Sequence, residues 1–559
     1  MDTFDEEKQG DSMTKIRLRE EEDLAKALSE RSGAPYVNLA FFPINIDALR
    51  ALPEKTARET KTAAFNIVNK KLSVGALAPQ SDAVLNVVDE LTRKGYTVEI
   101  YIVSENSLNR VWDRYEELSH ATVSKAGSIV ISEENIIALR EQIKTLADVT
   151  KNIATLVESK EANRLTKIME VILAGSLALK ASDIHLEPTE TEVRLRYRLD
   201  GVLTDIAMFD SRTYSLVLSR IKLVSGMKVN VQGAQDGRFS IKISDSEIEI
   251  RTSIVPSTYD DSVVMRVLDP ASISVDLEKL GIHPRLLAIL EREMNKPNGM
   301  ILTTGPTGSG KTTSLYAFLK KKYDPEIKVI TIENPIEYHM KGIVQTQTDE
   351  NKNYTFASGL KAALRQDPDV IMVGEIRDNE TASIAINAAL TGHIVFSTLH
   401  TNNAAGTYPR LIDLGISPKV LTSSLTVSMA QRLIRKICEF CKKETPLEGH
   451  EKEITERILG TIGDVTYLDG IQRNNHFVHV GCEKCNNTGY KGRTGVYEAI
   501  LSDKAIEDTV MNYPSEREIW AAAKPQNILN MKQDAILKIL KGETSFDEVK
   551  RVVDLENDY

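Results

Sequence analysis

Residues 298–313 read NGMILTTGPTGSGKTT, in which an apolar run at 300–302 leads into a loop of glycines, threonines and a serine. Residues 305–312 fit the pattern G-x-x-x-x-G-K-[ST], a phosphate-binding loop that follows a buried strand and opens a helix. Glycines let consecutive backbone N–H groups turn inward, and the helix adds the positive end of its dipole. The stretch therefore predicts a nucleoside triphosphate site within an α/β core.

The residues of this loop have distinct expected roles. Lys311 is expected to reach the β- and γ-phosphates, and the hydroxyl of Thr312 to bind Mg²⁺. A glycine-rich turn without a ligand is the weaker alternative, because a strand precedes the loop and a helix follows it. The residues expected to bind ATP are Gly305, Pro306, Thr307, Gly308, Ser309, Gly310, Lys311, Thr312 and Thr313.

Short apolar runs alternate with helical segments from about 275 to 430: MILTTG, KVITIENP, DVIMVGE and HIVFSTLH. Runs this uniformly apolar are typical of strands buried on both faces of a parallel sheet. The segment DNETASIAINAALTG has helical spacing and ends at Gly392, the expected C-cap. The alternation predicts βαβ units, with ligand-binding groups at the carboxyl ends of the strands.

Acidic residues and histidines stand at these strand ends. Glu375 ends one apolar run, Glu333 and Glu337 follow another, and His393 and His400 bracket a third. Hydrolysis needs a carboxylate that positions metal and water beside the phosphates. We therefore expect the acids at this edge, while a structural and a site role both stay open for the two histidines.

The rest of the chain is organised around this core. EVRLRYRLDG (residues 192–201) alternates apolar residues with three arginines, and the RFSIKI and IEIRTSIV segments predict a hairpin. A solvated strand face is the plain explanation for the arginines. The predicted parts are a disordered acidic tail at 1–20, an α/β domain at 21–118, a helical linker at 119–160, a second domain at 161–272, the core at 275–430 and a C-terminal region at 431–559.

Composition excludes several classes. The chain has 559 residues, 42 % hydrophobic and 27 % charged, with a net charge of −10. No apolar run of about 18 residues is present, which argues against a membrane-spanning helix, and the acidic start is unlike a secretory signal. The negative charge argues against direct binding of nucleic acid, because phosphate neutralisation needs clustered Lys and Arg. We expect a cytoplasmic protein.

All four cysteines fall in two CxxC pairs, Cys438 with Cys441 and Cys482 with Cys485. Two such turns can supply four thiolates to one tetrahedral Zn²⁺, which leaves no open position for catalysis. A redox pair or four reduced thiols is the alternative. The spacing predicts a structural zinc module.

The motifs GPTGSGKTT, TIENPIEY, LRQDPDVIMVGEIRD and TGHIVFSTLHTN occur in this order, and GCEKCNNTGYKGRTGVYE and KGETSFDEVKRVVD follow them. Together they resemble the Walker A motif, acidic box, Walker B motif, histidine box and C-terminal motifs of the secretion ATPases of type II secretion and type IV pilus systems (GspE/PilB-like). The resemblance covers roughly residues 160–559, with a weaker echo at 30–110. It implies a RecA-like P-loop core behind a PAS-like, arginine-bearing α+β domain.

The resemblance also implies roles for individual residues. Glu375 would position Mg²⁺ and water, and Glu337 would assist in-line attack on the phosphate. Arg251 and Arg266 match arginines with which the second domain closes on the phosphates. The two remaining expected catalytic residues are Arg365, from the core, and His400, from the histidine box.

Five positions depart from the family pattern. Asn334 stands where the acidic box usually has Asp, and Lys361 where an arginine is usual. Asp260 and Asp261 replace a Gly-Glu pair, and Ala535 replaces a glycine. Lysine lacks the planar fork of arginine, so Lys361 should bind phosphate less well.

The leading hypothesis is a cytoplasmic hexameric motor ATPase that powers pilin polymerisation or type II secretion. The family implies an inner-membrane platform protein as partner, with contact to the membrane only through partners. The connector LDPASISVDLEKLG, with its proline and glycine, is expected to act as a hinge. A nucleotide-gated scaffold with little turnover and a nucleic-acid translocase remain alternatives, and a retraction motor is disfavoured because those chains usually lack the four cysteines.

Overall fold

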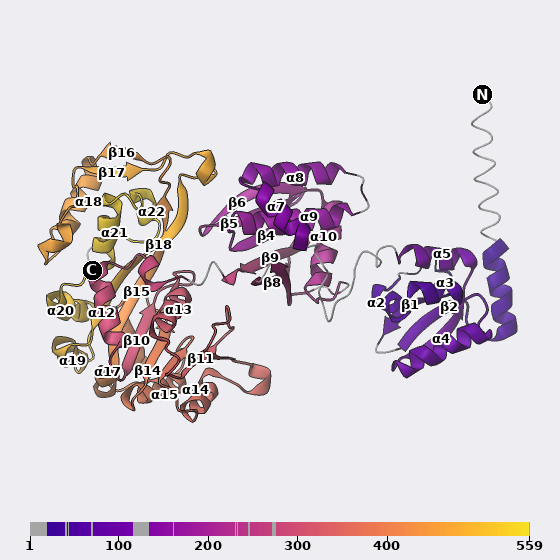
Figure 1. Cartoon of the computed structure of the whole chain (residues 1–559), viewed down its shortest axis with the longest axis horizontal. Helices are drawn as coiled ribbons and strands as arrows, with labels where there is room; N and C mark the ends of the chain where they lie inside the picture. The colour runs from indigo at the N-terminus through magenta and orange to yellow at the C-terminus, as the bar shows by residue number, and fades with distance from the viewer. Residues whose placement is uncertain are drawn as a thin grey trace. The chain divides into compact units, whose positions relative to one another are not determined.

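The computed structural model describes residues 20–39, 42, 44–68, 71–115, 133–159, 161, 163–229, 231, 233–243, 246–270 and 275–557. The chain divides into two compact units, Met1–Val130 and Ile131–Tyr559 (Figure 1). The tail predicted for 1–20 lies outside the described residues apart from Glu20, as do residues 116–132 of the predicted linker and 271–274 of the predicted hinge.

The first unit is a small mixed α/β fold. Its sheet has the order β1-β2-β3, with β1 antiparallel and β3 parallel to the central strand. The parallel pair is joined through α4, which is the βαβ connection that parallel strands require. The elements are β1 (Thr62–Val68), β2 (Lys71–Ala76), β3 (Thr97–Ile102), α2 (Ile46–Ala51), α3 (Glu54–Glu59), α4 (Asp82–Arg93) and α5 (Glu105–Asp113). The α/β prediction for this region is confirmed.

The second unit begins with an antiparallel six-stranded sheet of order β6-β5-β4-β9-β8-β7. Its strands are β4 (Asp183–Pro188), β5 (Val193–Leu199), β6 (Val202–Phe209), β7 (Gln235–Ile243), β8 (Ser246–Pro256) and β9 (Asp261–Leu268). Alternate residues of β5, including Leu195 and Tyr197, are fully buried, and the hydroxyl of Tyr197 donates to Ile172 of α9. The period-two pattern therefore places helices on one face of this sheet.

Four helices accompany this sheet: α7 (Glu133–Gln142), α8 (Leu146–Glu158), α9 (Arg164–Ala178) and α10 (Ser211–Val224). Both α7 and α8 pack against α9, and α8 also packs against β6. Residues 133–158 of the predicted linker are thus part of this α+β lobe, because α8 buries Val149 and Ile153.

The core sheet of the second unit has seven strands in the order β12-β11-β13-β14-β10-β15-β18. All neighbours are parallel except β18, which runs antiparallel to β15. The strands are β10 (Gly299–Thr304), β11 (Val329–Glu333), β12 (Val344–Gln347), β13 (Val370–Val373), β14 (Ile394–Leu399), β15 (Leu425–Ile437) and β18 (Tyr490–Leu501). Every residue of β10, β11, β13 and β14 is buried, which confirms the prediction of a parallel sheet covered on both faces.

The expected domain boundary at 430 lies inside β15, and β18 continues the same sheet beyond it. A sheet ending at β15 would leave its backbone groups unpaired, and β18 satisfies them. The hydrophobic core is likewise continuous from Met300 to Leu555. The C-terminal region therefore completes the core, and within its described residues only the antiparallel pair of β16 (Lys443–Pro446) and β17 (Asn475–Val478) forms a separate small sheet.

The helices of the core are α12 (Pro284–Met294), α13 (Lys311–Lys322), α14 (Phe356–Leu364), α15 (Asn379–Leu390), α16 (Thr407–Asp413), α17 (Pro418–Ser424), α18 (Gly449–Leu459), α19 (Lys504–Val510), α20 (Glu516–Ala523), α21 (Met531–Leu540) and α22 (Phe546–Lys550). α15 ends at Leu390, and Gly392 beyond it has the positive φ of +105° expected after a helix. In the described ranges, no helix combines the length and apolarity that a bilayer crossing needs.

Candidate functional site

The predicted phosphate-binding loop joins β10 to α13. Gly310 caps α13 with φ +90°, a left-handed conformation that favours glycine. A Cβ at Gly305 would lie 2.6 Å from the carbonyl oxygen of Gln431 on β15, so this position has no room for a side chain. The glycines of the motif are therefore explained by backbone turns and close packing, and the first N–H groups of α13 are left for a ligand.

Lys311 lies folded over this loop. Its Nζ donates to the carbonyl oxygens of Gly305 at 2.8 Å and Pro306 at 3.1 Å. Burial lowers the pKa of Lys311, the charge of Glu375 opposes that shift, and Arg432 adds to it. A polyphosphate would favour the charged lysine, because an opposite charge stabilises it. Thr312, exposed in the first turn of α13, is placed to reach a metal ion on such a ligand.

Two buried polar atoms behind the loop were not predicted from the sequence. Gln431 donates from Nε2 to the carbonyl oxygen of Ser309 at 2.8 Å. Its Oε1 and the Oγ of Ser309 are buried and have no hydrogen-bond partner among the described residues. Buried polar groups are usually satisfied, so these atoms fit a site that binds a polar ligand or water.

Glu375 lies just beyond the end of β13 and is bound by two basic side chains. Its Oε1 is 2.6 Å from Nη2 of Arg377, and its Oε2 is 3.4 Å from Nε2 of His400. His393, at the opposite end of β14, instead lies 2.9 Å from the carbonyl oxygen of Ala388 through Nδ1. The structure thus brings His400 to the acidic edge and gives His393 a local contact.

The two carboxylates of the acidic box have different environments. Glu337 is half-buried, and its Oε2 lies 3.5 Å from Nη1 of Arg251. Glu333 is only 2 % exposed and accepts hydrogen bonds from Tyr316, Thr331 and Gln345. Glu337 is therefore the carboxylate available to a ligand.

Several arginines of the six-stranded sheet β4–β9 lie in one line across neighbouring strands. Arg251 and Arg266 stand opposite each other in the register of β8 and β9, and Asp183 of β4 stands opposite both Arg266 and Arg198. The Nε atoms of Arg266 and Arg198 lie 3.1 and 3.2 Å from the carboxylate of Asp183. These arginines are not simply solvated, because the buried carboxylate of Asp183 pairs with both Arg198 and Arg266.

Arg365 is not brought to this cluster. It caps the C-terminus of α14 and is exposed, and its side chain has no hydrogen bond or ion pair with the described part of the chain. Of the expected catalytic residues, the structure groups Lys311 and Glu375 with His400, and Glu337 with Arg251.

The departures from the family pattern are bound elsewhere. Lys361 pairs with Glu380 at 2.6 Å on the exposed surface of α14 and α15. Asp261 pairs with the buried Lys222 at 2.6 Å, and Ala535 is fully buried in α21. The phosphate-binding loop, Glu337 and Glu375 keep the family residues, whereas Asn334 departs from the pattern within the acidic box.

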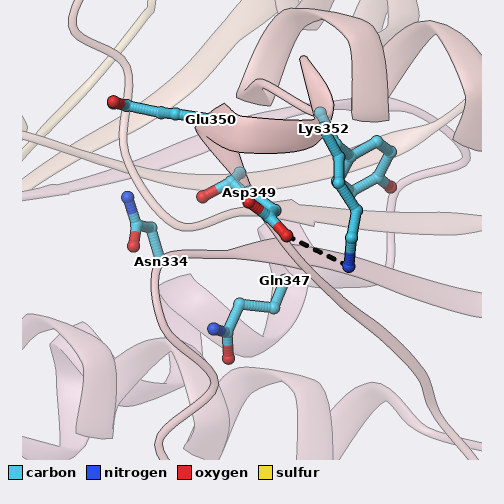
Figure 2. Close-up of a pocket in the computed structure, with 7 residues that line it drawn as sticks. Asn334, Gln347, Asp349, Glu350 and Lys352 are labelled. Atoms are coloured by element: carbon cyan, nitrogen blue, oxygen red, sulfur yellow. Dashed lines mark ion pairs between the residues drawn. The ribbon is translucent and has the colours of Figure 1, made fainter. Parts of the chain in front are cut away.

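Asn334 lines a pocket of about 540 Å³ at the ends of β11 and β12, with Gln347, Thr348, Asp349, Glu350, Lys352 and Tyr354. Figure 2 shows Lys352 reaching the carboxylate of Asp349, whereas Glu350 points away from that pair. The distance between the charged atoms is 3.1 Å. The pocket is polar and lies next to the acidic box.

The four cysteines converge although the two pairs are far apart in sequence. Cys438 and Cys482 have their Sγ atoms 3.9 Å apart, Cys441 and Cys485 3.8 Å, and Cys482 and Cys485 3.7 Å. A tetrahedral site with Zn–S bonds of about 2.3 Å places its sulfurs about 3.8 Å apart. The donor set therefore fits a tetrahedral metal ion such as zinc.

Comparison with known proteins agrees with this geometry. Residues 158–551 match the model of the type II/IV secretion system protein family, and residues 32–122 match the MshEN domain. The chain is 34 % identical over 542 residues to the type IV pilus assembly ATPase PilB of Myxococcus xanthus, which covers 97 % of this chain and 92 % of that protein. It is 41 % identical over 409 residues to the type II secretion system protein E of Dickeya dadantii, covering 73 % and 79 % of the two chains.

Among solved structures, the ATPase DotB of Yersinia pseudotuberculosis superposes with a TM-score of 0.50 at 20 % identity, covering 70 % of this chain and 94 % of that one. At this identity the likeness concerns the fold alone. With the loop, the strand-end acids and the two family matches in place, the chain belongs to the type II/IV secretion system protein family and is a P-loop ATPase.

Proposed function

We propose that this ATPase is a homohexameric motor that powers pilin polymerisation or type II secretion through a platform protein in the inner membrane. The names of its relatives support both systems. The single observation that carries the motor hypothesis is the contact of Arg251, on the six-stranded sheet, with Glu337 and Ile336 of the nucleotide core. A group that can sense the phosphates from a second lobe can convert hydrolysis into movement.

In the proposed reaction, Lys311 and the backbone N–H groups of residues 305 and 307–313 hold the phosphates of ATP. Thr312 and Glu375 would hold Mg²⁺, which neutralises phosphate charge when bound. Glu375, oriented by its contact with His400, positions the attacking water. Glu337 assists in-line attack.

Three arginines are proposed to stabilise charge that develops in the transition state. Arg251 already reaches the acidic box, whereas Arg266 would exchange its contact with Asp183 for one with phosphate. Arg365 would approach from the exposed end of α14. Guanidinium groups suit this role because they stay charged and bind phosphate oxygens in a fork.

ATP would favour a closed arrangement of the two lobes of Ile131–Tyr559, because its γ-phosphate offers negative charge to both Lys311 and Arg251. Loss of that phosphate would favour the open arrangement. In a ring, successive closures would shift the neighbouring subunit and move the membrane partner. We propose that the protein lies in the cytoplasm at the inner face of the membrane, with no direct contact to nucleic acid or lipid.

We further propose that Cys438, Cys441, Cys482 and Cys485 hold a structural Zn²⁺. Backbone N–H groups of Gly481 and Gly489 donate to Sγ of Cys441 and Cys485, each at 3.3 Å. Such donors stabilise thiolates, the form that binds metal. Four sulfur ligands would exclude water and substrate from this ion.

The scaffold with little turnover is the alternative that the departures at Asn334 and Lys361 suggest. Lys361 pairs with Glu380 on the surface, whereas Asn334 lines the pocket next to the acidic box, so a measurement of turnover decides between scaffold and motor. The deciding experiment is complementation of a deletion strain with wild type or Glu375→Gln, with surface pili and secreted protein measured side by side. Wild type should restore one of the two processes, and the variant neither. Restoration of either process by Glu375→Gln would refute the motor proposal. Sedimentation of the variant with ATP should show a hexamer.

A further inference from the structure

Glu333, at the end of β11, is a buried carboxylate to which the proposed reaction gives no role. It is 2 % exposed, and three side chains donate to it. Its Oε1 accepts from Oγ1 of Thr331 at 2.5 Å and from Nε2 of Gln345 at 3.1 Å, and its Oε2 accepts from the hydroxyl of Tyr316. A buried acid surrounded in this way orients its neighbours.

The direction of these hydrogen bonds follows from the backbone. The amide oxygen of Gln345 accepts the N–H of Met340 at 2.6 Å, so its NH₂ group must face Glu333 and the carbonyl oxygen of Tyr338. An NH₂ group can only donate, and the carboxylate of Glu333 must accept. Burial raises the pKa of Glu333, while the bonds from Thr331, Tyr316 and Gln345 counteract that shift.

Tyr316 has one hydroxyl proton, which it donates to Glu333. The hydroxyl oxygen is then free to accept, and the backbone N–H of Glu337 donates to it at 3.2 Å. The ring of Tyr338 packs edge-on against the ring of Tyr316, with centroids 4.7 Å apart at 88°. Tyr316 therefore contacts the segment that carries Glu337 twice: its hydroxyl binds the backbone N–H of Glu337, and its ring packs against the ring of Tyr338.

Tyr316 belongs to α13, the same helix that begins with Lys311. A helix of this length is rigid, so it fixes the distance between the tyrosine hydroxyl and the phosphate-binding loop. The phosphate-binding loop is therefore connected to the acidic box by α13, the hydroxyl of Tyr316 and the backbone N–H of Glu337. Catalytic groups lose activity when displaced by as little as about 1 Å.

We infer that Tyr316 is a positioning residue, whose hydroxyl is oriented by the buried Glu333 and holds Glu337 at a set distance from the phosphate-binding loop. This inference rests on the role in ATP hydrolysis proposed for Glu337. Tyr316 touches no phosphate itself and acts only through the acidic box.

The test is Tyr316→Phe in the full-length protein, with steady-state phosphate release measured over a range of ATP concentrations. We expect kcat to fall about tenfold, the scale of one hydrogen bond, with KM for ATP changed less than about twofold. Glu333→Gln should give a loss of the same kind, because its NH₂ would face other donors. The matched control is Tyr408→Phe, which removes a buried hydroxyl that lies 3.1 Å from the hydroxyl of Ser502. Ser502 follows β18, at the edge of the core sheet opposite to β11 and the acidic box, so this variant should keep the wild-type kcat.

A double-mutant cycle separates positioning from general damage. If Tyr316 acts through Glu337, then Tyr316→Phe should cause no further loss of kcat in the Glu337→Gln background. Hydrogen exchange of the peptide that spans residues 334–340 should be faster in Tyr316→Phe and unchanged in Tyr408→Phe.

Three results would each overturn the inference. They are a wild-type kcat in Tyr316→Phe, multiplicative losses of kcat in the double variant, and unchanged hydrogen exchange of the peptide 334–340 in Tyr316→Phe. The proposed function fails in a different way. If Glu337→Gln alone keeps wild-type kcat, the role of Glu337 is refuted and the positioning role falls with it. If Glu337→Gln lowers kcat and Tyr316→Phe does not, only the positioning role is refuted.

Discussion

Arg251 donates from Nη2 to the carbonyl oxygen of Ile336 at 2.6 Å, and its Nη1 lies 3.5 Å from Oε2 of Glu337. The same side chain is oriented within its own sheet by Glu249, at 3.0 Å from Nε. Arg266 stands directly opposite Arg251 in the register but binds Asp183 instead. Two arginines that one family pattern treats alike therefore have different environments, and this difference can be tested.

Replacing Arg251 by alanine should lower turnover by about 100-fold or more, because arginines that contact transferring phosphates contribute on that scale. The Kd for ATP should change only a few-fold. Arg266→Ala should also lower turnover more than binding. The measurements are phosphate release and binding of a fluorescent ATP analogue, and Lys242→Ala, on an exposed position of β7, is the control. Full turnover in both arginine variants would contradict their assigned role.

Lys311→Ala and Glu375→Gln should separate binding from hydrolysis. The first removes the cation folded over the loop and should weaken ATP binding. The second keeps the shape of the side chain and removes the charge that Arg377 and His400 hold in place, so ATP should bind while phosphate release stops. Wild-type phosphate release by purified Glu375→Gln would show that another group positions the water.

The cysteine centre predicts about one Zn²⁺ per chain by elemental analysis of protein purified without chelator. Cys482→Ser should lose the metal and destabilise the β16–β17 sheet between the two cysteine pairs, because Cys482 and Cys438 join segments 44 residues apart. The variant should lose thermal stability in this region while its affinity for ATP, which depends on Lys311, stays close to that of wild type. Protein that contains no zinc would refute the metal assignment.

Glu548 predicts a pH-dependent contribution to stability. It is fully buried and pairs with Arg435 and Arg551, each at 2.7 Å. Burial raises the pKa of Glu548, but the hydrogen bonds from the two arginines outweigh it, and the net pKa is lowered. Glu548→Gln should lower the free energy of unfolding by about 3 kcal/mol at neutral pH, because it leaves the half-buried guanidinium of Arg435 without its charged partner.

The sign follows from linkage. A lowered folded-state pKa contributes stability above the unfolded pKa of about 4.3, and that stability is lost as pH falls through the folded value. The difference between wild type and Glu548→Gln in urea unfolding should therefore shrink below about pH 4.3. Asp508→Asn is the control, since its pair with Lys504 is exposed and solvent screens it, so its contribution to stability should be small at either pH. An equal difference at pH 7 and pH 4 would contradict this account.

Much of the core sheet could be predicted because its signals are local. Strands buried on both faces read as continuous apolar runs, and β10, β11, β13 and β14 all conform. β18 could not be assigned to the sheet in this way, because about 50 residues, among them the four cysteines, separate it from its partner β15. Strand order depends on contacts between distant segments, which the pattern of a single segment does not record.

The same division applies to the candidate site. The positions of Gly310, Lys311 and Glu375 at the ends of core strands and at the start of a helix could be predicted, because glycines, a lysine and a strand-end acid occur within short stretches. Arg365 was expected beside the phosphates, and the structure leaves it exposed at the end of α14. The contacts of Gln431 with the loop and of Arg377 with Glu375 were missed, although Arg377 stands only two residues from its partner.

The sequence by itself determined the phosphate-binding loop, the parallel core and the two CxxC pairs that form the cysteine cluster, because each depends on residue types at short, characteristic spacings. Only the tertiary structure decided which carboxylate of the acidic box is buried and which is available. Tyr316 and Glu333 lie 17 residues apart on a helix and a strand, and Arg251 and Glu337 lie 86 apart on two sheets. Their side chains meet because packing of whole elements brings them together, and burial then determines which groups must be hydrogen-bonded and which can bind a ligand.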